Sequence, residues 1–109
     1  MKILDTWEFI KRKREKNMLN FGQSPTFNHY SDPGHSWVRV PLSLIEYLNL
    51  ENKISSYSYI KNKWVYLEED CDYSIFRNTF LQHYNKEPIT VMKHTNNRSS
   101  IRNYCHYTA

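Results

Sequence analysis

The order of local patterns between Ser31 and Asp72 constrains the fold of this chain more than any other feature. Residues 37–40 alternate between apolar and polar side chains, as a half-buried β-strand does. Pro41 ends that strand and suits the first turn of a helix. The apolar residues of 44–50 then recur at helical spacing, which predicts a short amphipathic helix directly after the strand.

A hairpin and a second helix are expected to follow. Residues 54–60 and 63–67 are interpreted as two strands, with Lys61-Asn62 as their turn because Asn tolerates the left-handed conformation. A second helix is expected to be capped by Asp72 or Ser74 and to end before Pro88, and a last short strand is expected over 89–92. The order β-α-β-β-α-β predicts an α+β fold, compatible with a ferredoxin-like sandwich of two helices on an antiparallel sheet.

The first thirty residues differ in composition from the rest and are expected to be an appendage. Residues 20–30 are rich in Gly, Ser, Pro and Asn and are interpreted as a loop. Before them lies a basic run, a candidate contact for nucleic acid, formed by Lys11, Arg12, Lys13, Arg14 and Lys16. The predicted division is therefore a basic arm and loop over 1–30 and one α+β domain over 31–109, which ends in a polar tail.

Composition excludes several classes of protein. The chain has 109 residues, enough for one domain, and its aromatic share of 16% argues against general disorder. Its longest apolar runs are far too short to span a membrane, and no apolar segment of a secretory signal is visible. Two cysteines without CxxC spacing provide neither a disulfide framework nor a zinc site. A cytoplasmic setting is therefore expected.

The turn Asp32-Pro33-Gly34 leads into His35 and Trp37 and forms the first candidate site. By one interpretation, Asp32 only closes an Asx-turn and His35 is the first residue of a strand. By the other, His35 projects into a polar site with Trp37 as a stacking wall, where an imidazole beside carboxylates serves as a base or a metal ligand. Both interpretations stay open on the sequence alone.

Four carboxylates close the hairpin, on Glu68, Glu69, Asp70 and Asp72. The plainer interpretation is a solvated acidic turn before the N-terminus of a helix. The alternative is a magnesium or calcium site, since hard cations prefer clustered carboxylate oxygens, although the spacing differs from that of an EF-hand loop. Together with His35 the run would also supply an acid–base pair, but no complete nucleophile motif accompanies it.

The polar tail carries Arg98, Arg102 and Tyr104. Arginines four residues apart share one side of a helical segment, where two guanidinium groups grip one phosphate or carboxylate. The other interpretations are a disordered terminus and internal pairing of these arginines with Glu69, Asp70 or Asp72. The apolar surfaces of Ile101 and Tyr107 argue against disorder.

Four aromatic residues share one face of the predicted hairpin, namely Tyr57, Tyr59, Trp64 and Tyr66. Such a face either packs beneath a helix, stacks the bases of single-stranded nucleic acid, or anchors a protein partner. Lys61 and Lys63 lie near these residues, as the nucleic-acid alternative requires, but no RNP-like glycine-aromatic motif is present.

Two resemblances add expectations to these patterns. The segment Val38-Arg39-Val40-Pro41, with 44–50, Lys53-Ile54 and 64–67 after it, resembles the swapped-hairpin module of AbrB-type transition-state regulators, in which two chains interlock to bind DNA. The usual Gly-Asp before the second hairpin is replaced here by Glu51-Asn52-Lys53.

The chain after residue 31 also resembles uncharacterised small proteins of phages and plasmids. The shared elements are Asp-Pro-Gly-His-x-Trp at 32–37, Tyr-Leu-Glu-Glu-Asp-Cys-Asp at 66–72, and the run from Arg98 to Tyr104. This resemblance implies an origin in a mobile element, where small proteins modulate host machinery or neutralise host defence.

The expected function is that of a phage or mobile-element accessory protein that binds and blocks a host macromolecule or signalling molecule, as an anti-defence or host-takeover inhibitor. Its partner is expected to be a host protein or an anionic small molecule, with no cofactor, metal or membrane involved. The alternatives are a nucleic-acid-binding regulator of RRM-like or AbrB-like shape, and a small metal-dependent enzyme that uses His35 and Glu68–Asp72. The predicted binding residues are His35, Trp37, Tyr57, Tyr59, Glu69, Asp70, Asp72, Arg98, Arg102 and Tyr104.

Overall fold

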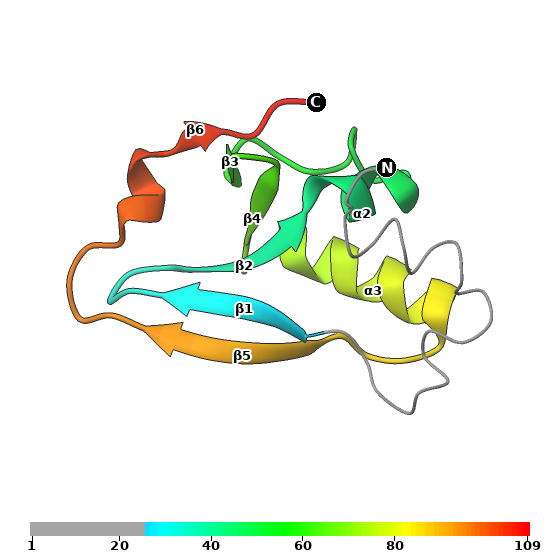
Figure 1. The fold of residues 1–109 in the computed structure, drawn as a ribbon, viewed down its shortest axis with the longest axis horizontal. Helices are drawn as coiled ribbons and strands as arrows, with labels where there is room; N and C mark the ends of the chain where they lie inside the picture. The colour runs from blue at the N-terminus through cyan, green and yellow to red at the C-terminus, as the bar shows by residue number, and fades with distance from the viewer. Residues whose placement is uncertain (1–25) are drawn as a thin grey trace.

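The computed structural model describes residues 26–109, so the basic arm lies outside the described residues. Six strands form one mixed sheet in the order β5-β1-β2-β4-β3-β6, and two helices pack on one of its faces (Figure 1). The predicted α+β class is confirmed. The strands are β1 (Thr26–Ser31), β2 (Ser36–Pro41), β3 (Tyr59–Lys61), β4 (Trp64–Glu68), β5 (Ile89–His94) and β6 (Cys105–His106). The helices are α2 (Leu42–Tyr47), α3 (Asp72–Tyr84) and the short 3-10 helix η2 (Ser100–Asn103).

The elements from β2 to β5 follow the predicted β-α-β-β-α-β order. β4 lies between β2 and β3 and is antiparallel to both, as in a split β-α-β unit. The hairpin turn consists of Asn62 and Lys63, whose φ angles are 53° and 69°, because Lys61 still pairs with Trp64. The predicted turn at Lys61-Asn62 is therefore wrong by one residue, although the reason given for Asn62 holds.

β1 occupies a segment that the sequence patterns assigned to a loop. It runs antiparallel to β2 and parallel to β5, so it lies inside the sheet, which is mixed rather than antiparallel throughout. Phe27 anchors the strand, with its ring centroid 5.5 Å from that of Phe76 and 6.0 Å from that of Phe80. The loop interpretation is wrong for residues 26–30, and these residues belong to the folded domain.

The predicted strand over 54–60 is wrong in its first half, since the strand begins only at Tyr59. The cause is the buried carboxylate of Asp72, whose Oδ2 accepts three hydrogen bonds from this segment. The Ser55 backbone N–H, the Ser55 hydroxyl and the Ser58 hydroxyl donate over 3.0, 2.7 and 2.6 Å. A buried carboxylate needs such partners, and satisfying it bends the segment into a turn around the start of α3.

The sheet buries apolar side chains on both of its faces. On the helix side, strand residues such as Val38, Val65 and Leu67 pack against α2 and α3. On the opposite side, Trp37 and Tyr66 are buried beneath Ile101 of η2. None of the helices within residues 26–109 is long and apolar enough to cross a membrane.

The tail after β5 is part of the fold. It crosses from β5 at one edge of the sheet to β3 at the other, where β6 pairs with β3 (Figure 1). Ile101 and Tyr107 are only 3% and 2% exposed, and the Tyr107 hydroxyl donates to the Glu51 carbonyl over 2.6 Å. The expectation that these two residues argue against disorder is confirmed.

Candidate functional site

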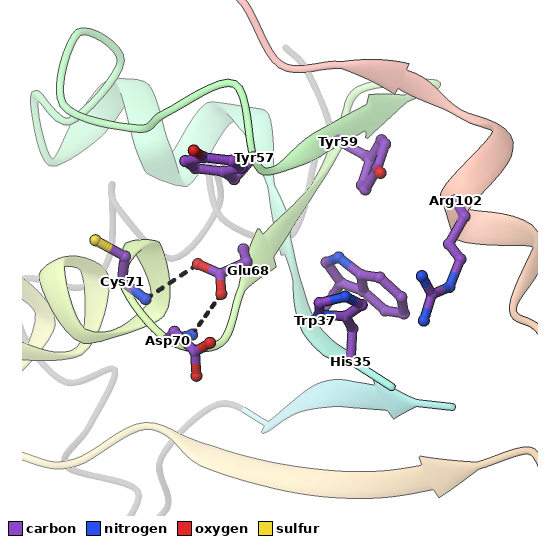
Figure 2. Close-up of a pocket in the computed structure, with 8 residues that line it drawn as sticks. All are labelled: His35, Trp37, Tyr57, Tyr59, Glu68, Asp70, Cys71 and Arg102. Carbon is purple, nitrogen blue, oxygen red and sulfur yellow. Dashed lines mark hydrogen bonds between the residues drawn. The ribbon is translucent and has the colours of Figure 1, made fainter. Parts of the chain in front are cut away.

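A cavity of about 430 Å³ opens where the start of β2, the end of β4, the start of α3 and η2 meet (Figure 2). This volume lies within the range of small-ligand sites. The cavity is lined by His35, Trp37, Tyr57, Tyr59, Glu68, Asp70, Cys71 and Arg102. Six of these eight residues are among the predicted binding residues, so the structure brings most of that set to one place.

The turn before β2 holds His35 and Trp37 at the cavity. The Asp32 carboxylate accepts hydrogen bonds from the backbone N–H groups of Gly34 and His35, each over 3.0 Å. The Asp32 N–H donates to the His35 carbonyl over 2.9 Å, which closes the turn from the other side. The predicted Asx-turn is confirmed, but the strand begins at Ser36 rather than at His35, and His35 instead lines the cavity.

Arg102 reaches the same turn from the tail. Its Nε and Nη2 donate to the two oxygens of Asp32 over 2.7 and 2.8 Å, and the Ser99 N–H adds a third bond over 2.9 Å. The guanidinium holds the pKa of Asp32 far below its usual value, and the same hydrogen bonds raise the pKa of Arg102. The predicted pairing of tail arginines with Glu69, Asp70 or Asp72 is wrong in its partner, because Asp32 neutralises Arg102 instead.

Most of the acidic run stabilises the local backbone. Glu68 accepts from the N–H groups of Asp70 and Cys71 over 2.9 and 3.1 Å, as Figure 2 shows. Glu69 accepts from the Ser36 hydroxyl over 2.5 Å, on the helix side of the sheet, while Asp72 is occupied by Ser55 and Ser58. In the part of the chain that the structure describes, only Asp70 of the four keeps a carboxylate without a hydrogen bond or ion pair.

The cavity has an aromatic wall and an acidic wall. The Trp37 ring lies 6.2 Å from Tyr59, edge-on, and 6.1 Å from the His35 ring. Tyr57 completes this wall and is 75% exposed. Glu68 and Asp70 lie across the opening from Trp37 and His35 (Figure 2). Since the charge of Arg102 is balanced by Asp32, the walls suit a flat group that is neutral or positively charged.

Two observations on the described residues bear on the enzyme alternative. Among residues 26–109, no three His, Cys, Asp or Glu side chains gather closely enough to hold a metal ion. The Nε2 of His29 lies 3.0 Å from the Ser36 hydroxyl, but that hydroxyl donates its proton to Glu69. His29 must therefore donate to Ser36, which is the reverse of what activation of a serine nucleophile requires.

Four predicted binding residues lie outside the cavity. Glu69 and Asp72 serve the internal hydrogen bonds described above, and Arg98 donates to Asn103 over 3.1 Å. Tyr104, at the end of η2, contacts Tyr66, with ring centroids 5.1 Å apart. The two arginines of the tail therefore do not grip one ligand together.

Cys71 is a lining residue that sequence reasoning missed. Its only sequence signal was a position inside the acidic run, because a lone thiol matches no motif. The functional part of Asp32, as the anchor of Arg102, was also missed, although the turn that contains it was singled out.

Comparison of the chain with protein-family models, with curated proteins and with solved structures finds no match. The resemblances to phage and plasmid proteins and to AbrB-type regulators therefore stay predictions.

Proposed function

We propose that the protein is a binding protein whose cavity holds a planar cationic group of its partner, such as the guanidinium of an arginine side chain. The observation that carries this proposal is that Asp70 lines the same cavity as Trp37, Tyr57 and Tyr59, and that its carboxylate has no hydrogen bond or ion pair with residues 26–109. A guanidinium stacks on aromatic faces and donates two parallel hydrogen bonds to a carboxylate. An aromatic wall opposite a free carboxylate matches both requirements.

The balance of charge favours a cation over an anion. Glu68 and Asp70 both line the cavity, whereas the cation of Arg102 is already bound by the buried Asp32. An anion would have to compete with Asp32 for Arg102 and would also approach two carboxylates. The anionic small molecule expected from the sequence is a competing prediction, and the titration below separates the two.

Binding, rather than turnover, is supported by the state of the candidate catalytic groups. His35 contacts Trp37, and within the described residues its ring accepts or donates no hydrogen bond that would orient it as a base. Cys71, the only thiol at the cavity, is exposed and has no histidine partner in residues 26–109. A catalytic nucleophile needs an adjacent base that is itself oriented, and these residues do not supply that arrangement.

In this proposal the partner is a host protein, and occupation of its arginine blocks its normal contact. The setting is the cytoplasm of an infected or host bacterial cell, as the resemblance to phage and plasmid proteins implies.

The test is an NMR titration of the ¹⁵N-labelled full chain with N-acetyl-arginine amide and, separately, N-acetyl-glutamate amide. We expect the arginine probe to shift the Trp37 indole and Cys71 amide signals with a Kd on the order of millimolar, as suits so small a ligand. Asp70→Asn should weaken this binding several-fold. Glu46→Gln, which removes an exposed carboxylate on α2, is the matched control. Tighter binding of the glutamate probe, or equal arginine binding by Asp70→Asn, would refute the proposal.

A further inference from the structure

The side of the sheet that carries Trp37 has a second surface, whose residues do not line the cavity. Tyr30 pairs with Trp37 and Lys93, Arg39 with Tyr66, and Lys61 with Trp64, so all of these side chains project from one face. Arg102 of η2 lines the cavity, whereas Tyr104, just after η2, contacts Lys61 on this second surface. We call this surface the Arg39 face and define it by Tyr30, Arg39, Lys61, Trp64, Lys93 and Tyr104.

Two cations of the Arg39 face lie on aromatic rings. The guanidinium carbon of Arg39 is 4.0 Å from the centroid of the Trp64 ring and 5.9 Å from that of Tyr30. The ammonium of Lys61 is 4.6 Å from the centroid of Tyr104. Neither cation forms an ion pair within residues 26–109. Arg39 also hydrogen-bonds with the neutral Tyr66 side chain, so rings and a hydroxyl hold these cations in place without neutralising their charges, which remain available to a ligand.

The strands carry almost no negative charge. Their charged residues are Arg39, Lys61, Lys93 and a single carboxylate, that of Glu68. Glu68 lies at the cavity, where it accepts two backbone hydrogen bonds, and so it does not neutralise the Arg39 face. An anionic partner therefore meets three cations and no opposing carboxylate on these strands.

The rings are placed for contact as well as for packing. Tyr30, Arg39, Trp64 and Tyr104 are all half-buried, with part of each side chain still open to solvent, while Lys61 is exposed. Neither α2 nor α3 covers this face, because both pack on the opposite side of the sheet, while η2 packs beside it through Ile101 on Trp37 and Tyr66. A platform of rings with interleaved cations and no acid is what the bases and phosphates of a single strand require.

We propose that the Arg39 face binds single-stranded nucleic acid. Bases stack on the Arg39–Trp64 pair and on Tyr104, while Lys61 and Lys93 contact phosphates. Stacking on a ring or a guanidinium plane needs unpaired bases, so a duplex cannot use these contacts. The inference is independent of the proposed cavity function, since the two surfaces share no lining residue.

The experiment measures fluorescence anisotropy of the full chain with a labelled 12-nucleotide oligo(dT), and with a labelled 12-base-pair duplex, over a range of salt concentrations. We expect tighter binding to the single strand, with affinity that falls steeply as salt rises. Arg39→Gln should weaken single-strand binding about tenfold, and Lys61→Gln should lower the salt slope by about one unit. Lys53→Gln, the same charge change at an exposed loop position, is the control and should leave affinity unchanged within about twofold.

Three results of the binding measurements above would overturn the inference, and two further variants test it below. These are equal affinity for the duplex, no single-strand binding at low salt, and equal loss of affinity in Arg39→Gln and Lys53→Gln. Replacing the five basic residues of 11–16 by Gln separates the basic arm from the face. Binding lost in that variant but retained in Arg39→Gln would assign the contact to the arm instead. A second variant, Trp64→Leu, must lose affinity while its melting temperature shows that it still folds.

Discussion

Replacement of Ile101 by alanine tests whether the tail is an integral part of the domain. Ile101 is 3% exposed and packs on Trp37 and Tyr66, so truncation leaves a cavity beneath η2. Ile→Ala changes in cores cost about 2–5 kcal/mol of unfolding free energy. Trp37 and Tyr66 are buried, but the outer rings of this cluster are only partly buried and leave room for relaxation, so we expect the lower half, about 2–3 kcal/mol. In a domain of this size that loss lowers Tm by about 10–20 °C.

The assay is thermal and urea unfolding of the full chain followed by circular dichroism. Val91→Ala is the control, because it also shortens a β-branched apolar side chain but at a position that is 42% exposed. We expect Val91→Ala to change the free energy of unfolding by about 0.5 kcal/mol or less. Equal Tm values for the two variants would refute the packing of the tail on Trp37. They would also refute the position of Arg102 in the cavity lining, because the same tail carries Arg102.

Three further predictions concern the polar groups around the cavity. The pKa of Asp32 is far below its usual value, so the stability that the Asp32 carboxylate gives to the fold is complete above about pH 4 and declines as pH falls towards the folded pKa. Asp32→Asn should therefore lose less Tm than the unmodified chain between about pH 4 and pH 2. Parallel curves of Tm against pH would contradict this. In Gly34→Ala the new Cβ would lie 2.9 Å from Nη2 of Arg102, so the guanidinium, at the end of a long side chain, should move at a cost of only a few degrees in Tm. This movement should change the titration of the cavity with the arginine probe. An unaltered titration would count against Arg102 as part of the cavity wall. Asp72→Asn should lower the free energy of unfolding in urea by about 2–4 kcal/mol, because three hydrogen-bond donors lose a charged acceptor. A loss below about 0.5 kcal/mol would show that these hydrogen bonds are not formed.

The elements from β2 to β5 were predictable because their signals are local. Pro41 separates a strand from a helix, and Asn62 permits the tight turn of the hairpin. β1 was not predictable in the same way. Phe27 is its single strongly apolar residue that faces the helices, and although β2 is adjacent in sequence, its other partner strand, β5, lies about sixty residues further along the chain. Pairing over such a distance leaves no trace in local composition.

The lining of the cavity was also largely predictable, since turn residues, aromatic residues and a dense acidic run are each unusual by themselves. The role of each acidic residue of the run was not predictable. Glu69 and Asp72 were singled out as binding residues, yet they bond to Ser36, Ser55 and Ser58 inside the fold. Which carboxylate stays free depends on hydrogen bonds between segments distant in sequence, and only the folded structure supplies those.

The pairing of Asp32 with Arg102 was not predictable for the same reason, because it also joins segments that are distant in sequence. The two residues are 70 positions apart, and Arg102 has acidic candidates in the hairpin that are closer in sequence. A buried acceptor that already binds two backbone N–H groups offers Arg102 a fixed, bidentate site, whereas the exposed Asp70 does not. Because Arg102 pairs with Asp32, the carboxylate of Asp70 stays available at the cavity.

The most direct test of the account is a crystal structure of the full chain grown with N-acetyl-arginine amide. The account predicts the guanidinium in the cavity, against the rings of Trp37, Tyr57 or Tyr59 and within about 3 Å of the Asp70 carboxylate, with the bond between Asp32 and Arg102 intact. An empty cavity at saturating probe, or a structure in which an anion displaces Asp32 from Arg102 while the arginine probe stays outside, would contradict it.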